Sequence, residues 1–348
     1  MKLKFILIAV TLSLLADSLN SQNLITVQNG GEPEFYLQVD DAIINSFDGD
    51  TIYIPGGSWN ITQPINNRLH LIGVGYHPDS THATFQTTLI GNLQLQAGSS
   101  YSSVTGIYLN GSIYNIDNPV IFFTASRCHF SNGITLNQLC SDFAFYENII
   151  DGYLTVNSDP DTLFNFSFFN NIINAIFSNN QRAVFFNSVF RNNVFLNGTS
   201  CFYGCYPCII CSFSVIENNV FKGISSGYGA SLLSGASNSI FNNNLFVEGI
   251  TFPLATNVGS NNLSVQDPNS IFINGYLAIL ECDYHLQSNC PGKNSGTDGT
   301  DIGIYGGSFP WKEGSIPFNP HFQSVSIPGT TDQNGNLNVN IKVAAQDH

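Results

Sequence analysis

The sequence predicts an all-β protein wound as a right-handed parallel β-helix, a single-stranded solenoid whose coils stack on one another. Three observations predict this fold. A residue pair, mostly Asn-Asn, recurs through the second half of the chain. Apolar residues recur at fixed places around the pair, and no helical periodicity accompanies either pattern. Repeats of this kind are typical of architectures in which each unit is stabilised by its neighbours.

The repeated pairs start 23, 22, 26, 25 and 18 residues apart, which suits one coil of three short strands joined by turns. The pairs are Glu147-Asn148, Asn170-Asn171, Asn192-Asn193, Asn218-Asn219, Asn243-Asn244 and Asn261-Asn262. Asn tolerates the left-handed backbone conformation of a bend, and stacked Asn amides can hydrogen-bond along a column. We therefore expect the pairs to lie over one another at one bend of each coil.

Apolar residues fill 16 of the 18 places that lie two positions before each pair and two and three positions after its first member. The residues at these places are Phe145, Phe168, Phe190, Ile216, Phe241 and Gly259; Ile149, Ile172, Val194, Val220, Leu245 and Leu263; and Ile150, Ile173, Phe195, Phe221, Phe246 and Ser264. Because coils stack about 4.8 Å apart, equivalent side chains should meet and be buried. We expect Phe168, Phe190 and Phe241 to point into the coil.

Residues 1–21 have the plan of a secretory signal peptide. Lys2 and Lys4 precede an apolar run from Phe5 to Leu15, and small and polar residues follow. Cleavage is expected after Ser18 or just before Gln22. The apolar run is shorter than the roughly 20 residues that span a bilayer, and no later stretch predicts a membrane span. We expect an exported protein that is secreted, periplasmic or held at the cell surface.

Three further regions follow the signal peptide. Residues 22–48 should form an N-terminal cap, residues 49–310 the β-helix of roughly ten coils, and residues 311–348 a C-terminal capping tail. The first cap should hold a short helix within Glu34–Phe47 that turns Leu37, Ile43, Ile44 and Phe47 towards one side. The alternating stretch Asn336–Val343 predicts a terminal strand that closes the far end. Caps are expected because exposed strand edges invite aggregation.

The strands upstream of the regular repeat are less uniform. Short β-rich runs are separated there by Gly, Asn, Asp and Ser turns. These runs are Thr51–Ile54, Leu69–Ile72, Thr88–Leu95, Val104–Leu109, Val120–Phe123 and Gly133–Leu136.

Three stretches of the chain carry a family resemblance. GDTIYIPGG at 49–57 and LHLIGVG at 69–75 resemble the opening coils of pectin-lyase-like right-handed parallel β-helix proteins. Residues 267–307, with DYHLQ at 283–287 and GTDGTDIGIYGG at 296–307, resemble the closing segment of secreted bacterial β-helix proteins, although Cys290 replaces the usual Ser. The resemblance implies the fold but no particular activity, since this superfamily contains lyases, hydrolases and binding modules.

The charge balance excludes nucleic-acid binding. The chain has 10 Lys plus Arg against 24 Asp plus Glu, a net charge of −14, and only 10% charged residues. Phosphate backbones are bound by clustered basic residues, which are missing from this sequence. Polyanionic sugars are poor partners too, unless a cation bridges them. We expect a polysaccharide or a cell-surface component as the partner.

The carboxylates do not form an obvious catalytic pair. Glycoside hydrolases place two carboxylates about 5–5.5 Å or 6.5–9.5 Å apart. Asp151, Glu217 and Glu248 occupy different places in separate coils, and Arg191 and Glu217 share a column where they can form a surface ion pair. The Arg-rich segment of pectate lyases is absent as well. We expect these acids to be structural.

Two sets of residues are candidates for a metal site. Asp298 and Asp301 in GTDGTD could hold calcium, but a turn closed by Asx hydrogen bonds is the preferred interpretation. His70, His77 and His82 could be ligands or bases, although His77 lies beside a proline in a turn. No other cofactor is expected.

The eight cysteines of an exported chain favour disulfides. Cys282–Cys290 is the preferred pair, and pairings among Cys201, Cys205, Cys208 and Cys211 cannot be deduced. Zinc coordination by thiolates and free thiols in the core stay open as alternatives. The C-x3-C-x2-C spacing within this run matches that of radical iron–sulfur enzymes, but those enzymes belong to a reducing cytosol.

Three functions remain possible for such a protein. The first is a non-catalytic module that binds carbohydrate or another surface along the β-helix, with Tyr203, Tyr206 and Tyr228 as candidate stacking residues. The second is a structural or adhesive rod at the cell surface. The third is a polysaccharide lyase or glycoside hydrolase with an unrecognised site. We prefer binding, because the surface is rich in Asn, Ser, Thr and aromatic residues.

Overall fold

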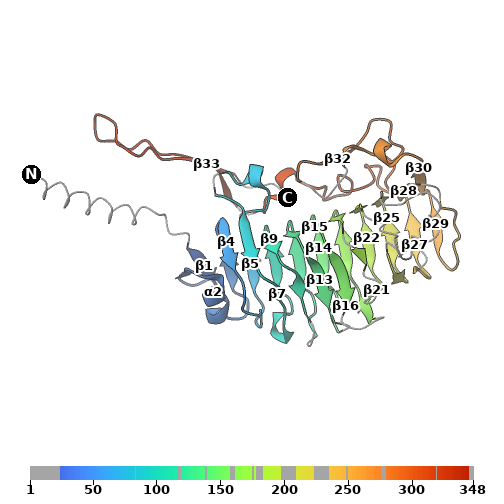
Figure 1. The fold of residues 1–348 in the computed structure, drawn as a ribbon, viewed down its shortest axis with the longest axis horizontal. Coiled ribbons are helices and arrows are strands. Elements are labelled where there is room, and N and C mark those ends of the chain that lie inside the picture. Colours follow the sequence, from blue (N-terminus) through green and yellow to red (C-terminus); the bar gives the residue numbers. More distant parts are fainter. Residues whose placement is uncertain are drawn as a thin grey trace, which may run out of the picture.

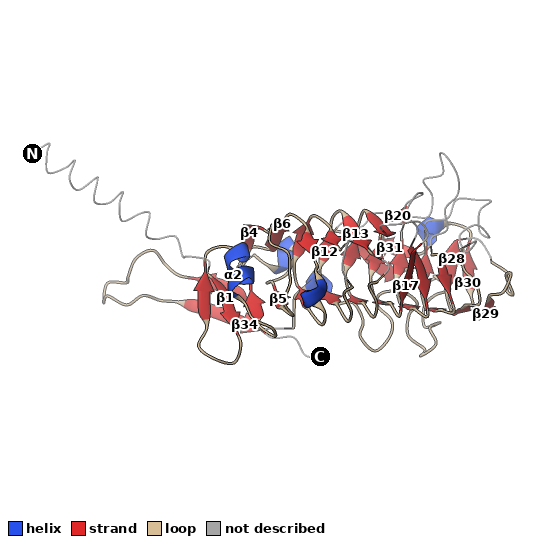
Figure 2. Cartoon of the chain, turned by 90° about the horizontal axis from the view of Figure 1, so that it is seen from below, coloured by secondary structure: helices blue, strands red, loops and turns tan. Residues whose placement is uncertain are grey.

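The computed structural model describes residues 24–82, 84–115, 119–137, 139–156, 161–174, 176–177, 183–196, 209–222, 235–247, 250–275, 280–318 and 320–344. Its short strands stack side by side into a parallel β-solenoid of about eight turns, as predicted for the fold class. Figure 1 shows the strands following one another along the long axis in sequence order, and Figure 2 shows the same rod from below. The predicted signal peptide and the loop cysteines 201, 205 and 208 lie outside the described residues.

Four sheets run along the solenoid. In spatial order, the first sheet contains β2 (Glu34–Tyr36), β1 (Ile25–Gln28), β3 (Thr51–Tyr53), β5 (His70–Ile72), β8 (Ser103–Thr105), β11 (Thr124–Ser126), β14 (Ala144–Tyr146), β18 (Ser167–Phe169), β22 (Val189–Arg191), β25 (Val215–Glu217), β27 (Ile240–Asn242) and β29 (Val258–Ser260). The second sheet contains β4 (Gly57–Asn60), β6 (Thr87–Ile90), β9 (Tyr108–Asn110), β12 (His129–Phe130), β15 (Ile149–Ile150), β19 (Ile172–Ile173), β23 (Val194–Phe195), β26 (Val220–Phe221), β28 (Leu245–Val247) and β30 (Leu263–Val265). The third contains β7 (Leu93–Gln94), β10 (Ile113–Tyr114), β13 (Gly133–Leu136), β16 (Tyr153–Val156) and β20 (Ile176–Phe177), and the fourth contains β17 (Asp161–Phe164), β21 (Ala183–Phe186) and β24 (Cys211–Ser212).

The predicted columns of apolar residues form the core. Phe145 pairs in register with Phe168, and Phe168 with Phe190. Their rings stack 5.0 and 4.9 Å apart and are buried. Phe195 and Phe221 stack in the same way, 4.7 Å apart, on the inner side of the second sheet. This packing confirms that like residues meet along the axis.

The number of turns is smaller than the roughly ten predicted. The prediction divided the chain by one constant period, but the coils differ in length. His70 and Ser103 are adjacent in register although 33 residues separate them. Coils of this kind use more residues in the bends, and about eight turns result.

The N-terminal cap contains a helix, but its apolar face differs from the prediction. The helix α2 spans only Val39–Asn45, and Glu34–Tyr36 is strand β2 instead. It buries Val39, Ala42 and Ile43. The other three predicted residues, Leu37, Ile44 and Phe47, are exposed, because the shorter helix turns them away from the first coil.

Contrary to the prediction, the C-terminal region does not close the far end of the solenoid. β31 (Phe272–Asn274) and β32 (Asp283–Leu286) form an antiparallel pair, and residues 287–318 then run back along the second sheet. β33 (His321–Ser326) and β34 (Asn340–Ala344) form an antiparallel hairpin near the N-terminal end (Figure 1). The predicted terminal strand therefore exists but pairs within this hairpin. None of the described helices is long and apolar enough to cross a membrane.

Candidate functional site

The side chains of the repeated pairs form polar rows at the bend between the first and second sheets. The first members of the six repeated pairs, from Glu147 to Asn261, all have a left-handed backbone with φ between 50° and 57°. The second members form a ladder that is buried from Asn148 to Asn244 and partly buried at Asn262. In one rung, the Asn171 side-chain amide donates to the Asn193 carbonyl oxygen (2.9 Å), and the Asn193 amide donates likewise to Asn219 (2.9 Å). Both predicted roles of Asn are present, divided between the two positions.

The first members also hold the C-terminal segment, which we define as residues 287–318. The Asn243 side chain donates to the Ser295 carbonyl (2.8 Å), and that of Asn170 donates to the carbonyls of Ile304 (2.8 Å) and Gly306. Between them, Asn218 exchanges hydrogen bonds with Thr297. A segment distant in sequence is thus fastened to one coil after another.

This segment lies on the outer face of the second sheet. A Cβ atom on Gly303 would meet the methyl groups of Val220 (3.1 Å) and Val194 (3.6 Å), so glycine is needed for such a close approach. Ile149, Val194 and Leu245 point outward from the sheet and are nevertheless buried. The glycine-rich stretch of the resemblance therefore serves to cover a sheet face.

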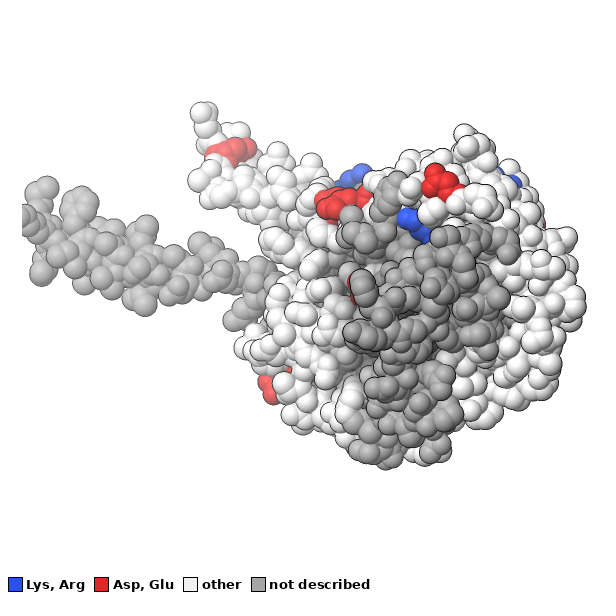
Figure 3. Space-filling view, turned by 45° about the vertical axis from the view of Figure 1, so that its right-hand side comes forward, with Lys and Arg blue, Asp and Glu red and all other residues white. Residues whose placement is uncertain are grey.

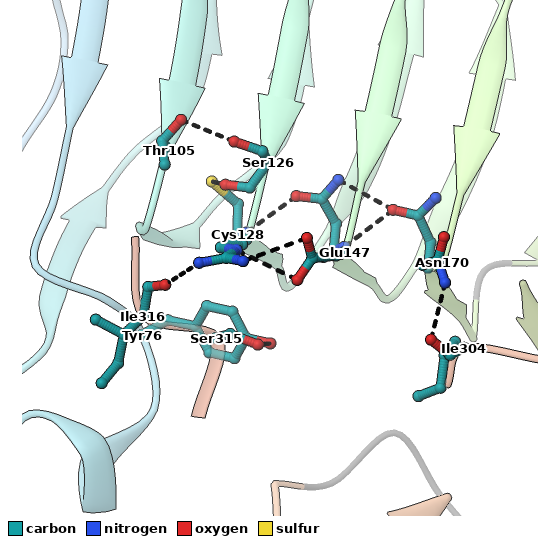
Figure 4. Close-up of polar contacts among 12 residues, drawn as sticks. Tyr76, Thr105, Ser126, Cys128, Glu147, Asn170, Ile304, Ser315 and Ile316 are labelled. Atoms are coloured by element: carbon teal, nitrogen blue, oxygen red, sulfur yellow. Dashed lines mark hydrogen bonds and ion pairs between the residues drawn. The ribbon is translucent and has the colours of Figure 1, made fainter. Parts of the chain in front are cut away.

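The last anchor of the segment is a buried ion pair. Arg127 Nε lies 3.2 Å from Glu147 Oε2, and Arg127 also donates to the Ile316 carbonyl. The guanidinium stacks on the Phe318 ring with 3.7 Å to its centroid. Figure 4 shows Glu147 near Ser315 and Ile316 of the C-terminal segment. The Tyr76 hydroxyl donates to the Ser315 hydroxyl there (2.7 Å).

Burial opposes both charges of this pair. It raises the pKa of Glu147, and the attraction of Arg127 offsets part of that effect. It also lowers the pKa of Arg127, against the attraction of Glu147. A buried ion pair is weak evidence for net stability, because desolvation offsets its attraction. This one also binds a backbone carbonyl and a ring of the C-terminal segment.

Beside this pair lies a groove between the first sheet and the C-terminal segment, with a volume of about 300 Å³. It is lined by Tyr146, Glu147, Phe169, Asn170, Arg191, Asn192, Gly307, Ser308 and Phe309. The Tyr146 and Phe169 rings stack 5.5 Å apart, 7° from parallel, so the groove meets their edges, whereas Phe309 is an exposed ring on the other wall. Burial raises the pKa of Tyr146, so its hydroxyl keeps its proton at neutral pH.

The charges of the groove are already compensated. Arg191 Nε donates to Glu217 Oε2 (3.0 Å), and its NH2 nitrogen lies 2.8 Å from the same oxygen, which confirms the predicted ion pair. Glu147 is paired with Arg127. In Figure 3 most of the charged side chains that can be seen gather along the upper part of the view, and the rest of the described surface there is white. The groove therefore suits an uncharged ligand recognised by hydrogen bonds and ring contacts.

The two acids at this border of the first sheet, Glu147 and Glu217, are too far apart to form a glycoside-hydrolase pair. Glu147 follows β14 and Glu217 ends β25, three strands further along the first sheet. Three strand spacings amount to about 14 Å, beyond the separation used by inverting enzymes. Asp151 lies elsewhere, after β15, where it contacts His129 Nε2 at 2.6 Å and accepts from Asn174 (3.0 Å). Glu248 lies outside the described residues.

A second polar cluster lies under the C-terminal segment. Tyr76, His77, Cys282, Tyr284, Tyr305 and Glu313 line a cavity of about 30 Å³ together with apolar side chains. Such a cavity holds about one water molecule. His77 is a turn residue, as the prediction preferred, since its Nδ1 accepts from the Asp79 backbone N–H (3.2 Å). The space is too small for a substrate.

The predicted calcium ligands are engaged in internal contacts. Asp298 Oδ1 accepts from the Thr300 backbone N–H (3.0 Å), the Asx turn that was preferred. Asp301 is bound by Lys293 Nζ (2.9 Å) and by the Asn294 backbone N–H. Within the described ranges, no group of three or more His, Cys, Asp and Glu side chains is placed to hold a metal ion.

The predicted Cys282–Cys290 disulfide is wrong. Both residues are free thiols, as are Cys128, Cys140 and Cys211. The extended strand β32 separates Cys282 from Cys290 and advances the chain by about 13 Å, whereas bridged cysteines need Cα atoms within roughly 7 Å. Burial raises the pKa of Cys128 and of Cys211 to about 12, so these thiols are unreactive core residues.

Sequence reasoning missed most of the groove. The predicted stacking residues Tyr203, Tyr206 and Tyr228 lie outside the described residues. The signal for the groove was present in the sequence: Tyr146, Phe169 and Arg191 each directly precede a repeated pair. Since Phe145, Phe168 and Phe190 face inward, their successors in the strand must face outward. Phe309 could not be found in this way, because its position depends on the path of the C-terminal segment.

Comparison with protein-family models gives no match, and no curated protein matches the chain at a significant level.

Proposed function

We propose that this protein is a non-catalytic, exported carbohydrate-binding module that holds an uncharged saccharide in the groove beside β14, β18 and β22. We also infer that its solenoid is of the right-handed, pectin-lyase-like kind, which the opening and closing motifs support. The groove carries the proposal. It combines an exposed ring and a protonated phenol with charges that are neutralised within the protein.

The volume of the groove fits a saccharide of limited size. About 300 Å³ is at the lower end of small-molecule sites, so we expect one or two sugar units to be enclosed. Phe309 offers a ring face to the apolar side of a sugar, and Tyr146 and Arg191 border the remaining space. The Asn170 and Asn192 amide nitrogens already donate to the C-terminal segment. An acidic sugar would meet a protein of net charge −14 and is not expected to bind.

The test is a glycan array of neutral and acidic saccharides, followed by titration calorimetry with the best neutral ligand. We expect Tyr146→Ala and Phe309→Ala each to weaken binding at least about tenfold, equivalent to about 1.4 kcal/mol. Tyr53→Ala is the matched control. Tyr53 occupies the same outward column and is 37% exposed against 38% for Tyr146, but it lies outside the groove.

Three results would contradict the proposal. The first is the absence of binding to any neutral saccharide, which together with retention in the cell envelope would favour a structural rod. The second is equal loss of binding in the Tyr53 and Tyr146 variants. The third is release of reducing ends or unsaturated products from a polysaccharide, which would make the protein an enzyme.

A further inference from the structure

A second aromatic feature lies at the opposite border of the first sheet, at the bend through which the chain enters that sheet. Five of six successive coils place an aromatic side chain along this bend, which we name the aromatic edge, and the coil of Ser141 and Asp142 between Phe122 and Phe164 places none. The five aromatic residues are Tyr101, Phe122, Phe164, Phe186 and Phe213. Backbone hydrogen bonds connect these coils in order, from Tyr101 to the coil of Phe122 and from Phe213 to the coil of Ser237.

The rings of the edge are exposed and leave faces uncovered. Tyr101, Phe122, Phe164 and Phe213 have exposed fractions between 44% and 56%. Tyr101 and Phe122 stack 4.9 Å apart. Phe164 and Phe186 are tilted by 53° at 5.4 Å, and Phe186 and Phe213 by 46° at 5.1 Å. Tilted rings cannot cover one another fully, unlike the parallel Phe145, Phe168 and Phe190 rings of the core.

Folding does not explain these residues. Tyr101, Phe122 and Phe213 have φ of 65°, 56° and 52°, a conformation that is costly for bulky side chains. At the same place in other coils, Asn165, Asn187 and Asn238 adopt it, and Asn suits it better. The chain thus accepts strain in order to present rings to solvent, where they add little to the core. Repeated strain at one bend, at residues that add little to the core, motivates a search for a function there.

Polar groups accompany the rings. The Asn165 amide donates to Asp142 Oδ1 (2.9 Å), and the Asn187 amide donates to Asn165 Oδ1 (2.8 Å). Each amide uses one N–H in this external ladder, and the exposed side chains turn their other groups to solvent. Ser212 and Ser237 continue the polar line two coils further, with their hydroxyls 2.6 Å apart. The rings therefore form two groups, Tyr101 with Phe122 and Phe164 with Phe186 and Phe213, which the polar coil of Ser141 and Asp142 separates.

We propose that the aromatic edge is a second binding site, which takes an extended, uncharged, β-linked polysaccharide lying along the solenoid axis. Five coil spacings separate Tyr101 from Phe213, or about 24 Å. One coil spacing is close to the length of one sugar unit in a flat, extended chain, so successive sugars can meet successive coils. A helical or strongly curved glycan would leave the straight edge after a few units. This site does not depend on the groove.

The experiment measures depletion of the full-length protein from solution by microcrystalline cellulose and by chitin. Phe122→Asn combined with Phe213→Asn should reduce the bound fraction at least tenfold, because both ring clusters lose a member. Asn is the residue that neighbouring coils use at this backbone conformation, so the double variant should keep the fold. Circular dichroism and the melting temperature check this.

Two control variants separate the aromatic edge from aromatic residues elsewhere on the surface. Phe85→Asn removes another phenylalanine that is 74% exposed and has φ of 62°, but lies away from the edge, and should leave binding unchanged. Tyr53→Ala removes an exposed ring that lies outside both the groove and the edge and should also leave binding unchanged. The double variant should still bind a soluble neutral disaccharide as the wild type does, so failure of the groove proposal and failure of this one are distinguishable. Polygalacturonate, a polyanion, should not compete.

Three outcomes would overturn the proposal. Wild-type protein that remains in solution with both polysaccharides has no such site. Equal binding by the wild type and the double variant shows that the rings are not used. Self-association of the wild type that the double variant loses, measured by sedimentation without polysaccharide, would make the edge a contact between copies of this chain.

Discussion

At the scale of the residue, the two members of each repeated pair have different tasks. The first adopts the left-handed conformation and, in several coils, turns its side chain to the C-terminal segment. The second turns inward and joins the buried ladder. This division explains why Glu147 can replace Asn at the first position of one pair. Every second member from Asn148 to Asn262 is Asn, because a ladder rung needs both a donor and an acceptor.

Asn193→Ala should destabilise the solenoid by roughly 2–4 kcal/mol, because buried polar groups that lose a partner cost about 1–3 kcal/mol each. The change removes the acceptor for Asn171 and the donor to the Phe168 carbonyl (2.8 Å). Urea unfolding followed by circular dichroism measures the loss. Asn242→Ala is the control, since Asn242 also bonds the next coil, through Ser260, but on the outer face, and should cost less than about 1 kcal/mol. Equal losses in both variants would contradict the importance of burial.

Residues that repeat in every coil were predictable from the sequence, whereas residues whose role depends on a distant segment were not. The inward columns and the Asn ladder follow from spacing alone, since they repeat in every coil. Arg127 and Glu147 could not be paired from sequence, because the pair matters only where the C-terminal segment covers it. The exposed Phe122 and Phe213 look like core residues in the sequence, and only the backbone register turns them outward.

At the scale of the element, the C-terminal segment covers the outer face of the second sheet, which is apolar on both sides. Strands such as β23 and β26 are buried on both faces, so they read as continuous apolar pairs rather than as alternating residues. The inner face packs in the coil, and the outer face needs a cover. The sequence indicated a closing segment at 267–307 but not its direction, because nothing local specifies that it returns along the rod.

Breaking the ion pair at the end of this segment should release it. Glu147→Gln leaves the buried Arg127 cation without its counter-charge and should cost about 3–5 kcal/mol. Adding Arg127→Met removes the second charge, so the double variant should lose less than the sum of the two single losses. Urea unfolding gives the free energies, and limited proteolysis reports whether the segment has loosened.

The matched control for this cycle is the Arg191–Glu217 pair, which joins the same residue types on adjacent coils. Because Arg191 is 46% exposed, water screens its charge. Glu217→Gln should cost less than about 1 kcal/mol. Additive losses at Arg127 and Glu147, or an equally large loss at Glu217, would show that burial does not distinguish the two pairs.

At the scale of the whole molecule, the solenoid is stabilised lengthwise as well as from coil to coil. Hydrogen bonds from Asn243, Asn218, Asn170 and Arg127 tie one continuous segment to coils far apart along the rod. In a simple repeat protein each unit contacts only its neighbours. Here a long-range contact couples the two ends, and we expect more cooperative unfolding than stacked coils alone would give.

Two truncations separate the parts of the C-terminal region. A chain that ends at Phe318 loses only the hairpin β33–β34, whose apolar side chains are exposed, and should keep nearly the full melting temperature. A chain that ends at Gly275 also loses the segment over the second sheet. It exposes Ile149, Ile172, Val194, Val220 and Leu245, whose burial contributes about 1.5–3 kcal/mol each. This shorter chain should aggregate or bind a hydrophobic dye strongly, as light scattering and dye fluorescence measure. If it melted like the longer one, the coils would be stable alone and the segment would be free to serve another purpose.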